Sequence, residues 1–235
     1  MLFATLSGAH LYGFPSPDSD WDLRGMHVLP VDAFLGLGGP RDETVTIDRI
    51  DPELHLDLVT HDVRKFLSLL RKPNGYVLEQ LLSPWVLHTT PLHQELVALA
   101  PRVLTREHAR HYLGFAQNQW KLWTREEPFR AKPLLYIYRV LLTGLHLLRT
   151  GRLECDLNVL LDDHPDLADV RELIHAKRTG SEDLPLAAPD IARHHARYED
   201  LCLALAALRE SSRLPQQHHA DPELEDFLRR ARLKG

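Results

Sequence analysis

Two aspartates near the N-terminus, Asp20 and Asp22, are the residues whose type and spacing most clearly indicate chemistry. They stand two positions apart in a stretch, residues 19–23, that reads as the start of a strand. Residues two apart in a strand point to the same face, so the two carboxylates are expected to lie side by side. Adjacent carboxylates repel each other unless a cation lies between them, and a divalent metal ion supplies that charge.

A glycine-containing turn precedes this pair of aspartates. It begins at Gly8, Ala9 and His10, directly after a short apolar run at residues 2–7. Glycine lets backbone N–H groups approach a polyphosphate closely. The sequence therefore predicts that a metal ion and a nucleotide meet here, with Gly8, Ala9, His10 and Ser19 as nucleotide-binding residues.

A third carboxylate is expected on a neighbouring strand at residues 55–59. The two leucines of this stretch are expected to face the core, which leaves Asp57 facing Asp20 and Asp22. Three carboxylates can hold two Mg²⁺ or Mn²⁺ ions roughly 3.5–4 Å apart, one activating a hydroxyl and one neutralising a triphosphate. Asp20, Asp22 and Asp57 are therefore predicted as catalytic residues and metal ligands. The alternative is a pair of aspartates in a solvated turn and a third on an exposed strand edge.

Hydrophobic periodicity predicts the elements that position these residues. Strands are expected at residues 2–7, 21–28, 44–50 and 53–60, and helices at residues 63–71 and 76–82. From residue 91 onward the pattern is helical, with helices expected at residues 105–123, 132–150, 166–177, 189–213 and 221–233. The sequence thus predicts a catalytic α+β domain at residues 1–90 and an α-helical C-terminal domain at residues 91–235.

Composition and charge limit the class of protein. The chain has 235 residues, and its net charge of −5 argues against a generally basic nucleic-acid coat. Residues 1–60 contain ten acidic and three basic side chains, a formal charge of −7 that suits a metal site. The two cysteines have no metal-ligand spacing and favour a reducing compartment, and no apolar run reaches the ~18 residues that span a membrane. We therefore expect a cytoplasmic protein without membrane contact.

The helical half carries a second candidate group. Lys132, Tyr136 and Arg139 have the spacing that places side chains on one helix face. A lysine and an arginine suit a triphosphate, and a tyrosine suits a base ring. These three are predicted as nucleotide-binding residues, with a solvated face around a half-buried tyrosine as the alternative. The basic run at residues 229–234 is expected to be a solvated helix end.

The residues around the aspartates also resemble a known signature. Nucleotidyltransferases of the DNA polymerase β superfamily carry a Gly-Gly or Gly-Ser pair, a spacer of about ten residues, and then an acid-hydrophobic-acid-hydrophobic run. The string is similar to that of the RNA-repair-pathway DNA polymerase β family. The matching segments are Gly8-Ala9, Tyr12-Gly13, Pro17-Asp18-Ser19-Asp20, Asp22-Leu23-Arg24-Gly25, and residues 64–67, 74–84 and 132–151.

The resemblance implies a DNA polymerase β-type mixed sheet with flanking helices, followed by an α-helical domain. It implies transfer of a nucleoside monophosphate from an NTP such as ATP to a hydroxyl, with release of pyrophosphate and an RNA end as the acceptor in RNA repair. Basic side chains would then guide the RNA. The candidates are Arg64, Lys65, Arg71, Lys72, Lys121, Arg125, Arg130 and Lys132.

Two departures from the family pattern bear on these expectations. Ala9 stands where a serine is usual, so a hydroxyl that would contact phosphate is absent. Relatives usually carry a helix before the first strand, and the corresponding flank of this sheet is either uncovered or a homodimer contact.

Other functions share the same signature. Transfer of AMP to a protein or a small molecule, as in toxin–antitoxin or antibiotic-modifying enzymes, uses the same core. A catalytically silent nucleotide- or RNA-binding protein is favoured by Ala9 and disfavoured by the presence of all three aspartates. The preferred base, the acceptor and the oligomeric state stay open at this point.

Overall fold

The chain folds into two units, each with its own core. The structure, a computed structural model, describes residues 1–35, 43–51, 54–186 and 189–234. The sheet unit comprises Met1–Gly8, Asp20–Leu104 and Gln217–Gly235, and the helical unit comprises Ala9–Ser19 and Thr105–Gln216. The predicted division at residue 90 differs from this grouping, because the chain returns to the sheet unit at its C-terminal end.

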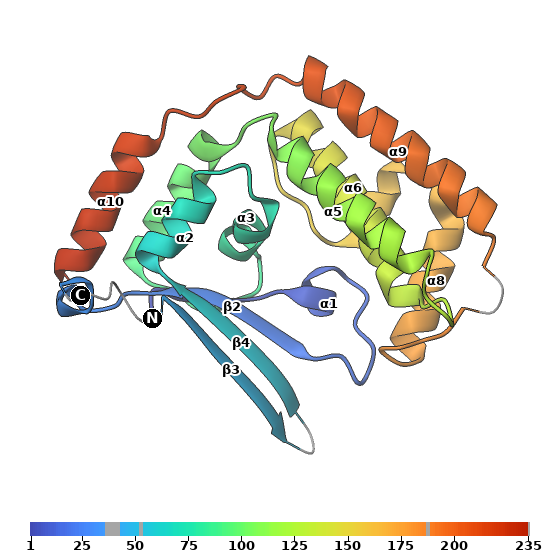
Figure 1. Ribbon diagram of the computed structural model, residues 1–235, viewed down its shortest axis with the longest axis horizontal. Helices are drawn as coiled ribbons and strands as arrows, with labels where there is room; N and C mark the ends of the chain where they lie inside the picture. The colour runs from blue at the N-terminus through green and yellow to red at the C-terminus, as the bar shows by residue number, and fades with distance from the viewer. Residues whose placement is uncertain (36–42, 52–53, 187–188, 235) are drawn as a thin grey trace. The chain divides into compact units, whose positions relative to one another are not determined.

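A mixed sheet forms the centre of the sheet unit (Figure 1). Its strands are β1 (Phe3–Leu6), β2 (Trp21–His27), β3 (Thr44–Asp51), β4 (Leu54–Asp62) and β5 (Val86–His88). They lie in the order β3-β4-β2-β1-β5, and only the β2–β4 pair is parallel. The first four strands confirm the sequence prediction. The short edge strand β5 was not predicted, because its three residues are all exposed and show no alternation.

Gly25 allows β1 and β2 to lie close together. A Cβ atom at this position would lie 2.3 Å from the carbonyl oxygen of Phe3, so a larger residue would push the strands apart. The inner half of β2, including the fully buried Met26, is covered by the core. The first residues of β2 are only partly covered, which leaves the Asp22 end of the strand accessible.

Helices pack on one side of this sheet (Figure 1). They are α2 (Val63–Leu70), α3 (Gly75–Leu82) and α4 (Pro91–Val103). Asp62 caps α2 by accepting a hydrogen bond from the N–H of Arg64, and Asn74 caps α3 by accepting one from the N–H of Tyr76. The apolar face of α2 is fully buried, so this helix contributes directly to the core.

The C-terminal helix α10 (Asp221–Lys234) belongs to the sheet unit and packs against α2. Arg232 forms an ion pair with the fully buried Asp62, at 2.7 Å, and Arg230 pairs with Glu95 of α4. The expectation of a solvated helix end is therefore wrong for these two arginines, because they join α10 to the rest of its unit.

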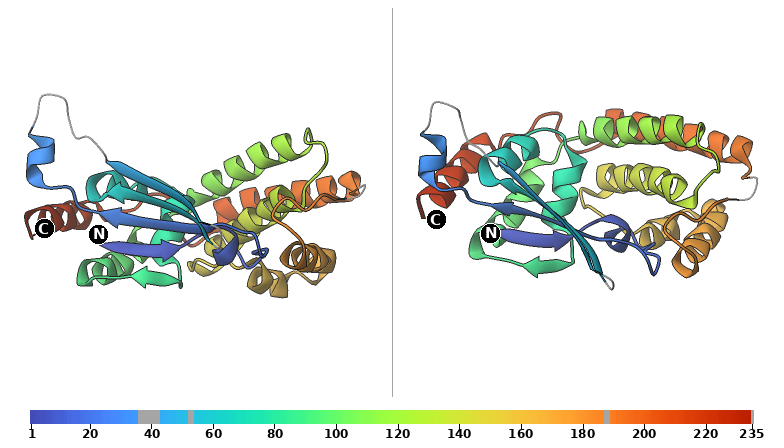
Figure 2. Two further views of the ribbon diagram at one scale, coloured as in Figure 1. Left: turned by 90° about the horizontal axis from the view of Figure 1, so that it is seen from below. Right: turned by 60° about the horizontal axis from the view of Figure 1, so that its bottom comes forward.

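A central helix organises the helical unit. Its helices are α5 (His108–Trp123), α6 (Ala131–Thr150), α7 (Leu157–Leu160), α8 (Ala168–Thr179) and α9 (Ile191–Ser211). α6 contacts the other four of these and is apolar nearly all round, as a buried helix must be (Figure 2). It ends at Gly151, which adopts φ +69°, as the sequence predicted. Within the described ranges, no helix is both long and apolar enough to cross a membrane.

The segment Ala9–Ser19 packs on this helical core. Its glycine, Gly13, has φ +82°, and a Cβ atom there would lie 2.0 Å from a carboxylate oxygen of Asp156. The carbonyl of Gly13 accepts a hydrogen bond from Asn158, and Tyr12 accepts one from the N–H of Leu157. The Tyr-Gly pair of the signature is therefore a docking point for this segment on α7.

Candidate functional site

Asp22 and Asp57 lie next to each other on the parallel strands β2 and β4. They are direct partners in the strand register, so their side chains extend from the same face of the sheet. Gly8 lies against this pair with φ +61°, and a Cβ atom there would approach a carboxylate oxygen of Asp22 to 1.8 Å. A glycine is therefore required at position 8 for Asp22 to keep its place.

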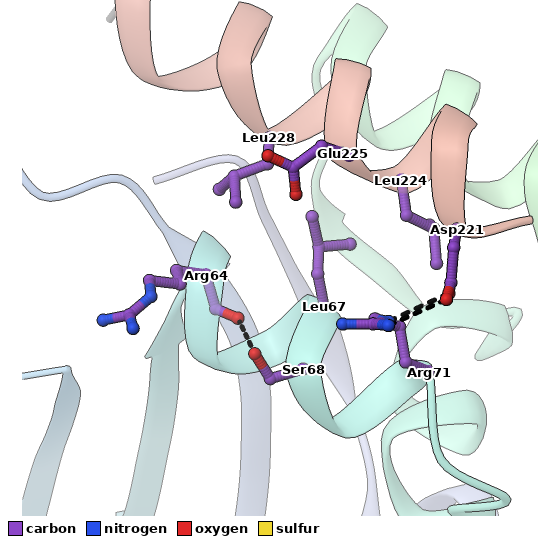
Figure 3. A pocket seen from close by; sticks show the side chains of 8 residues that line it. All are labelled: Arg64, Leu67, Ser68, Arg71, Asp221, Leu224, Glu225 and Leu228. Carbon is purple, nitrogen blue, oxygen red and sulfur yellow. Dashed lines mark hydrogen bonds and ion pairs between the residues drawn. The ribbon is translucent and has the colours of Figure 1, made fainter.

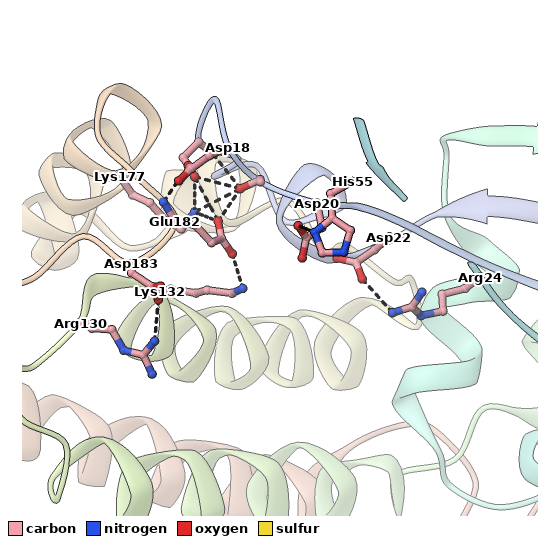
Figure 4. Close-up of polar contacts among 12 residues, drawn as sticks. Asp18, Asp20, Asp22, Arg24, His55, Arg130, Lys132, Lys177, Glu182 and Asp183 are labelled. Carbon is pink, nitrogen blue, oxygen red and sulfur yellow. Dashed lines mark hydrogen bonds and ion pairs between the residues drawn. The ribbon is translucent and has the colours of Figure 1, made fainter. Parts of the chain in front are cut away.

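One guanidinium group joins the two carboxylates, and Figure 4 shows its contact with Asp22. Nη2 of Arg24 donates to Oδ1 of Asp22 and to Oδ2 of Asp57, each at 2.8 Å. Burial works against the charge of Arg24, but Tyr76 and the two aspartates outweigh it and raise its pKa above the ordinary value. A cation therefore lies between two carboxylates, although it is a side chain and not a metal ion.

Asp20 takes a different partner. Its carboxylate pairs with Nδ1 of His55 (Figure 4). Nε2 of the same ring lies 2.9 Å from Oδ1 of Asp48. A hydrogen bond with Asp48, aided by Asp20, raises the pKa of His55 above its usual range. Asp48 is also the register partner of Asp57 on β3, so a row of three aspartates crosses β3, β4 and β2. Sequence reasoning missed Asp48; the symmetric register of the β3–β4 hairpin is the signal that identifies it.

The predicted metal site is thus assembled in part. Among the residues that the structure describes, no group of three or more His, Cys, Asp or Glu side chains forms a ready metal-binding cluster. Asp22 and Asp57 converge on one cation, whereas Asp20 is directed to His55. Carboxylate oxygens are the donors that Mg²⁺ prefers, and Asp22 and Asp57 already share one positive group, so their chemistry fits such an ion. Their catalytic role stays a prediction.

The predicted phosphate turn is a single helical turn, α1 (Gly8–Leu11). Ala9 is buried at 3% exposure, and His10 is half-buried. The side chain at position 9 therefore faces protein, and any contact of this residue with phosphate would come from its backbone. The nucleotide-binding roles of Gly8, Ala9 and His10 stay predictions.

Ser19 belongs to an internal polar cluster of the helical unit. Figure 4 shows Glu182, Lys132 and Lys177 of this cluster. The hydroxyl of Ser19 and that of Ser16 donate to Oε2 of Glu182, which also accepts from Nζ of the fully buried Lys177 at 2.6 Å. The other oxygen of Glu182 pairs with Lys132. Burial opposes the charge of Glu182, but hydrogen bonds from both lysines and Ser19 lower its pKa to about 2. Ser19, which was predicted to bind the nucleotide, thus donates its hydroxyl hydrogen bond to Glu182 within the helical unit.

Lys132 and Tyr136 line a pocket of about 300 Å³ in the helical unit. Its other lining residues are Phe115, Gln119, Arg130, Pro133 and Asp183. Arg139, predicted on the same helix face, is only 3% exposed, and its guanidinium lies 3.9 Å from the ring centre of Tyr12. The structure therefore brings two of the three predicted residues to a pocket and places the third against the segment Ala9–Ser19.

The basic residues expected to guide RNA are largely engaged in contacts within their own units. Arg71 makes a two-pronged ion pair with Asp221 beside a pocket of about 270 Å³ in the sheet unit (Figure 3). Arg130 pairs with Glu126 and Asp183, and Lys132 pairs with Glu182. These charges are partly neutralised before any nucleic acid arrives.

Comparisons with known proteins found chains that are similar to this one. Over 157 residues the chain is 34% identical to an uncharacterized protein of Methanocaldococcus jannaschii, which covers 66% of this chain and 63% of that protein. Over 191 residues it is 28% identical to the uncharacterized protein YcgL of Bacillus subtilis, which covers 77% of this chain and 71% of that protein. A solved nucleotidyltransferase-like protein from Exiguobacterium sibiricum aligns over 99% of this chain and 73% of its own, with 13% identity and a TM-score of 0.31.

The chain spans less than two thirds of the length of the M. jannaschii relative. The family model described as the RNA repair pathway DNA polymerase beta family matches residues 1–230, nearly the whole chain. The mixed sheet with flanking helices and a helical region confirms the fold class that the sequence predicted. The chain therefore belongs to the RNA repair pathway DNA polymerase beta family.

Proposed function

We propose that the protein is a metal-dependent nucleotidyltransferase that transfers a nucleoside monophosphate from an NTP to a hydroxyl group and releases pyrophosphate. The observation that carries this proposal is the pairing of Asp22 with Asp57, whose carboxylates share one cation within 2.8 Å of each. Two carboxylates held together around positive charge are the arrangement that phosphoryl transfer requires.

Asp22 and Asp57 would hold Mg²⁺ or Mn²⁺, with Asp20 as a third ligand once it leaves His55. Such ions, two in the arrangement that we propose, would neutralise the triphosphate and the pyrophosphate leaving group. Asp57 would accept the proton of the attacking hydroxyl. The hydroxyl oxygen then forms a bond to the α-phosphorus, and the bond between the α-phosphorus and the bridging oxygen breaks, so that pyrophosphate carries away the electron pair.

The pocket of about 300 Å³ in the helical unit supports the nucleotide-binding part of the proposal. Lys132 offers a cation at its edge, with a side chain 36% exposed, and Tyr136 contributes an aromatic ring to its lining. A cation suits phosphate oxygens and an aromatic ring suits a base. We therefore propose Lys132 and Tyr136 as the nucleotide-binding residues of this unit, and we no longer propose direct contact for the buried Arg139.

The acceptor is proposed from the family to which the chain belongs, and an RNA end is the first candidate. A second candidate is a protein or small-molecule hydroxyl, which would receive AMP. One observation favours this second candidate: Arg71, Arg130 and Lys132, expected to attract RNA, are already paired with carboxylates. A polyanion would have to displace these partners.

Labelled substrates distinguish the candidates. The protein is incubated with each α-³²P-labelled NTP, Mg²⁺ or Mn²⁺, and a panel of RNA ends, DNA ends and proteins, and the products are separated on gels. Label on RNA ends, lost in Asp57→Asn, is the expected result. Label on a protein band with none on any RNA would support the second acceptor. Labelling that persists unchanged in Asp57→Asn would show that the site is wrong.

A further inference from the structure

Arg24 lies between Asp22 and Asp57, and its guanidinium is fully hydrogen-bonded there. Its side chain is 11% exposed, and every nitrogen of its guanidinium donates a hydrogen bond within the sheet unit. Nη2 serves the two carboxylates, whereas Nη1 donates to the carbonyl oxygens of Leu23 and Asp57, each at 2.8 Å. These contacts fix both the place and the orientation of the positive charge.

Tyr76 holds the remaining nitrogen. Nε of Arg24 donates to the hydroxyl of Tyr76 at 2.8 Å. Tyr76 is the second residue of α3, and the side chain of Asn74 caps that helix at the N–H of Tyr76 itself. The guanidinium is therefore anchored by a rigid helix end as well as by the β2 and β4 backbones, and it does not depend on the carboxylates alone for its position.

This anchoring has a consequence for the entry of a metal ion. A free divalent ion that approaches Asp22 and Asp57 meets the fixed charge of Arg24 and competes with Nη2 for the same oxygen atoms. A metal ion that arrives bound to a triphosphate belongs to a complex with net negative charge, which Arg24 attracts. The same side chain thus opposes free metal and favours metal bound to nucleotide.

We propose that Arg24 is a positioning residue that holds Asp22 and Asp57 together in the metal-free protein and makes the site selective for a metal–nucleotide complex over a free divalent ion. This inference rests on the proposed function, since it assumes that Asp22 and Asp57 are metal ligands. The Arg of the Asp-Leu-Arg-Gly segment would then be the group that disfavours binding of a divalent ion without a nucleotide.

Titration calorimetry with Mn²⁺ alone tests the inference without measuring turnover. Arg24→Gln removes the competing charge, so it is expected to bind free Mn²⁺ about tenfold more tightly than the unmodified protein. With a non-hydrolysable NTP present, this advantage is expected to disappear or reverse. Tyr76→Phe loosens the anchor and should tighten binding about twofold. Arg229→Gln, which removes an exposed charge 72% accessible on α10, serves as the matched control and should change nothing.

Weaker or unchanged Mn²⁺ binding by Arg24→Gln would overturn the inference. Near-ultraviolet circular dichroism verifies that the variants fold. If Arg24→Gln does not fold, Tyr76→Phe carries the test, and unchanged affinity in that variant overturns the inference in the same way. Asp57→Asn separates the two proposals: if it binds Mn²⁺ as well as the unmodified protein, the metal site itself is wrong, whatever Arg24 does.

Discussion

The two polar clusters of this protein have opposite charge arrangements. In the sheet unit, one guanidinium of Arg24 lies between the carboxylates of Asp22 and Asp57. In the helical unit, one carboxylate of Glu182 lies between the ammonium groups of Lys132 and Lys177. The first cluster has an excess of negative charge and suits a cation, whereas the second has an excess of positive charge and suits an anion.

The two clusters also differ in how accessible their side chains are. The side chains of Asp22 and Asp57 are 24% and 30% exposed, so a ligand can reach them. Lys177 is fully buried and reaches Ser16 as well as Glu182, so its contacts hold the segment Ala9–Ser19 on the helical core. Lys132 of the second cluster lines the pocket of about 300 Å³. We infer that the first cluster performs chemistry, while the second mainly supports structure.

The largest expected effect comes from substitutions in the cluster of Arg24, Asp22 and Asp57. Asp22→Asn and Asp57→Asn should each lower the rate of nucleotide transfer on the order of 10³-fold, because each removes a charged metal ligand while keeping the side-chain shape. Transfer is measured with a labelled NTP, and circular dichroism monitors the fold. Asp32→Asn, an exposed aspartate of the same unit, is the control and should retain the full rate. If all three variants lost the same amount of transfer activity, Asp22 and Asp57 would be no more important for transfer than an ordinary surface aspartate.

Substitutions in the cluster of Glu182, Lys132 and Lys177 should lower the stability of the protein. Glu182→Gln leaves the charge of the fully buried Lys177 without its carboxylate, which is expected to cost about 3 kcal/mol of unfolding free energy. Combining it with Lys177→Met removes the unpaired charge and should restore most of that loss. Urea unfolding at pH 7 measures both. A single variant within about 0.5 kcal/mol of the unmodified protein would show that the cluster is not structural.

Because of Glu182, the stability of the protein is also expected to depend on pH in the acid range. The folded-state pKa of Glu182, about 2, lies below its ordinary value of 4.5. Its contribution to stability is therefore fully present above pH 4.5 and is lost as the pH falls toward 2. Because the group keeps some contact with solvent, we expect this contribution to be about 1–2 kcal/mol. The stability of the unmodified protein relative to the Lys177→Met/Glu182→Gln variant should fall by this amount over that range, and a constant difference would contradict the assignment.

The smallest expected effect concerns the edge of the helical pocket. Lys132→Ala should weaken NTP binding about fivefold, since it removes one exposed charge that is shared with Glu182. Calorimetry measures the affinity, and Arg178→Ala, an exposed basic residue of α8, is the matched control. Unchanged affinity in Lys132→Ala would mean that the pocket does not take a nucleotide.

Local patterns were sufficient to predict most elements of the fold. A short apolar run located β1, strand-like patterns located β2 to β4, and helical periodicity located α2, α3, α5, α6, α8, α9 and α10. The grouping of α10 with the sheet was not predictable, because it depends on pairs such as Arg232 with Asp62, 170 residues apart in the chain. Long-range pairing of this kind leaves no local periodicity.

For the candidate site, too, local patterns predicted some residues but not those that depend on long-range contacts. The spacing of the aspartates and the expected strand pattern identified Asp22 and Asp57, which the structure does bring together. The roles of Arg24 and Asp48 depend on strand register and were not visible in the spacing alone. Arg139 shares the predicted helix face, but its burial is decided by Tyr12 from a distant segment.

A crystal structure with Mn²⁺ and a non-hydrolysable NTP tests the central claim most directly. Anomalous scattering at the manganese edge locates the ion without reference to activity. We expect a peak roughly 2.0–2.6 Å from carboxylate oxygens of both Asp22 and Asp57, with Nη2 of Arg24 withdrawn from at least one of them. A peak elsewhere, with Arg24 still joining the two carboxylates, would contradict the assignment of this site.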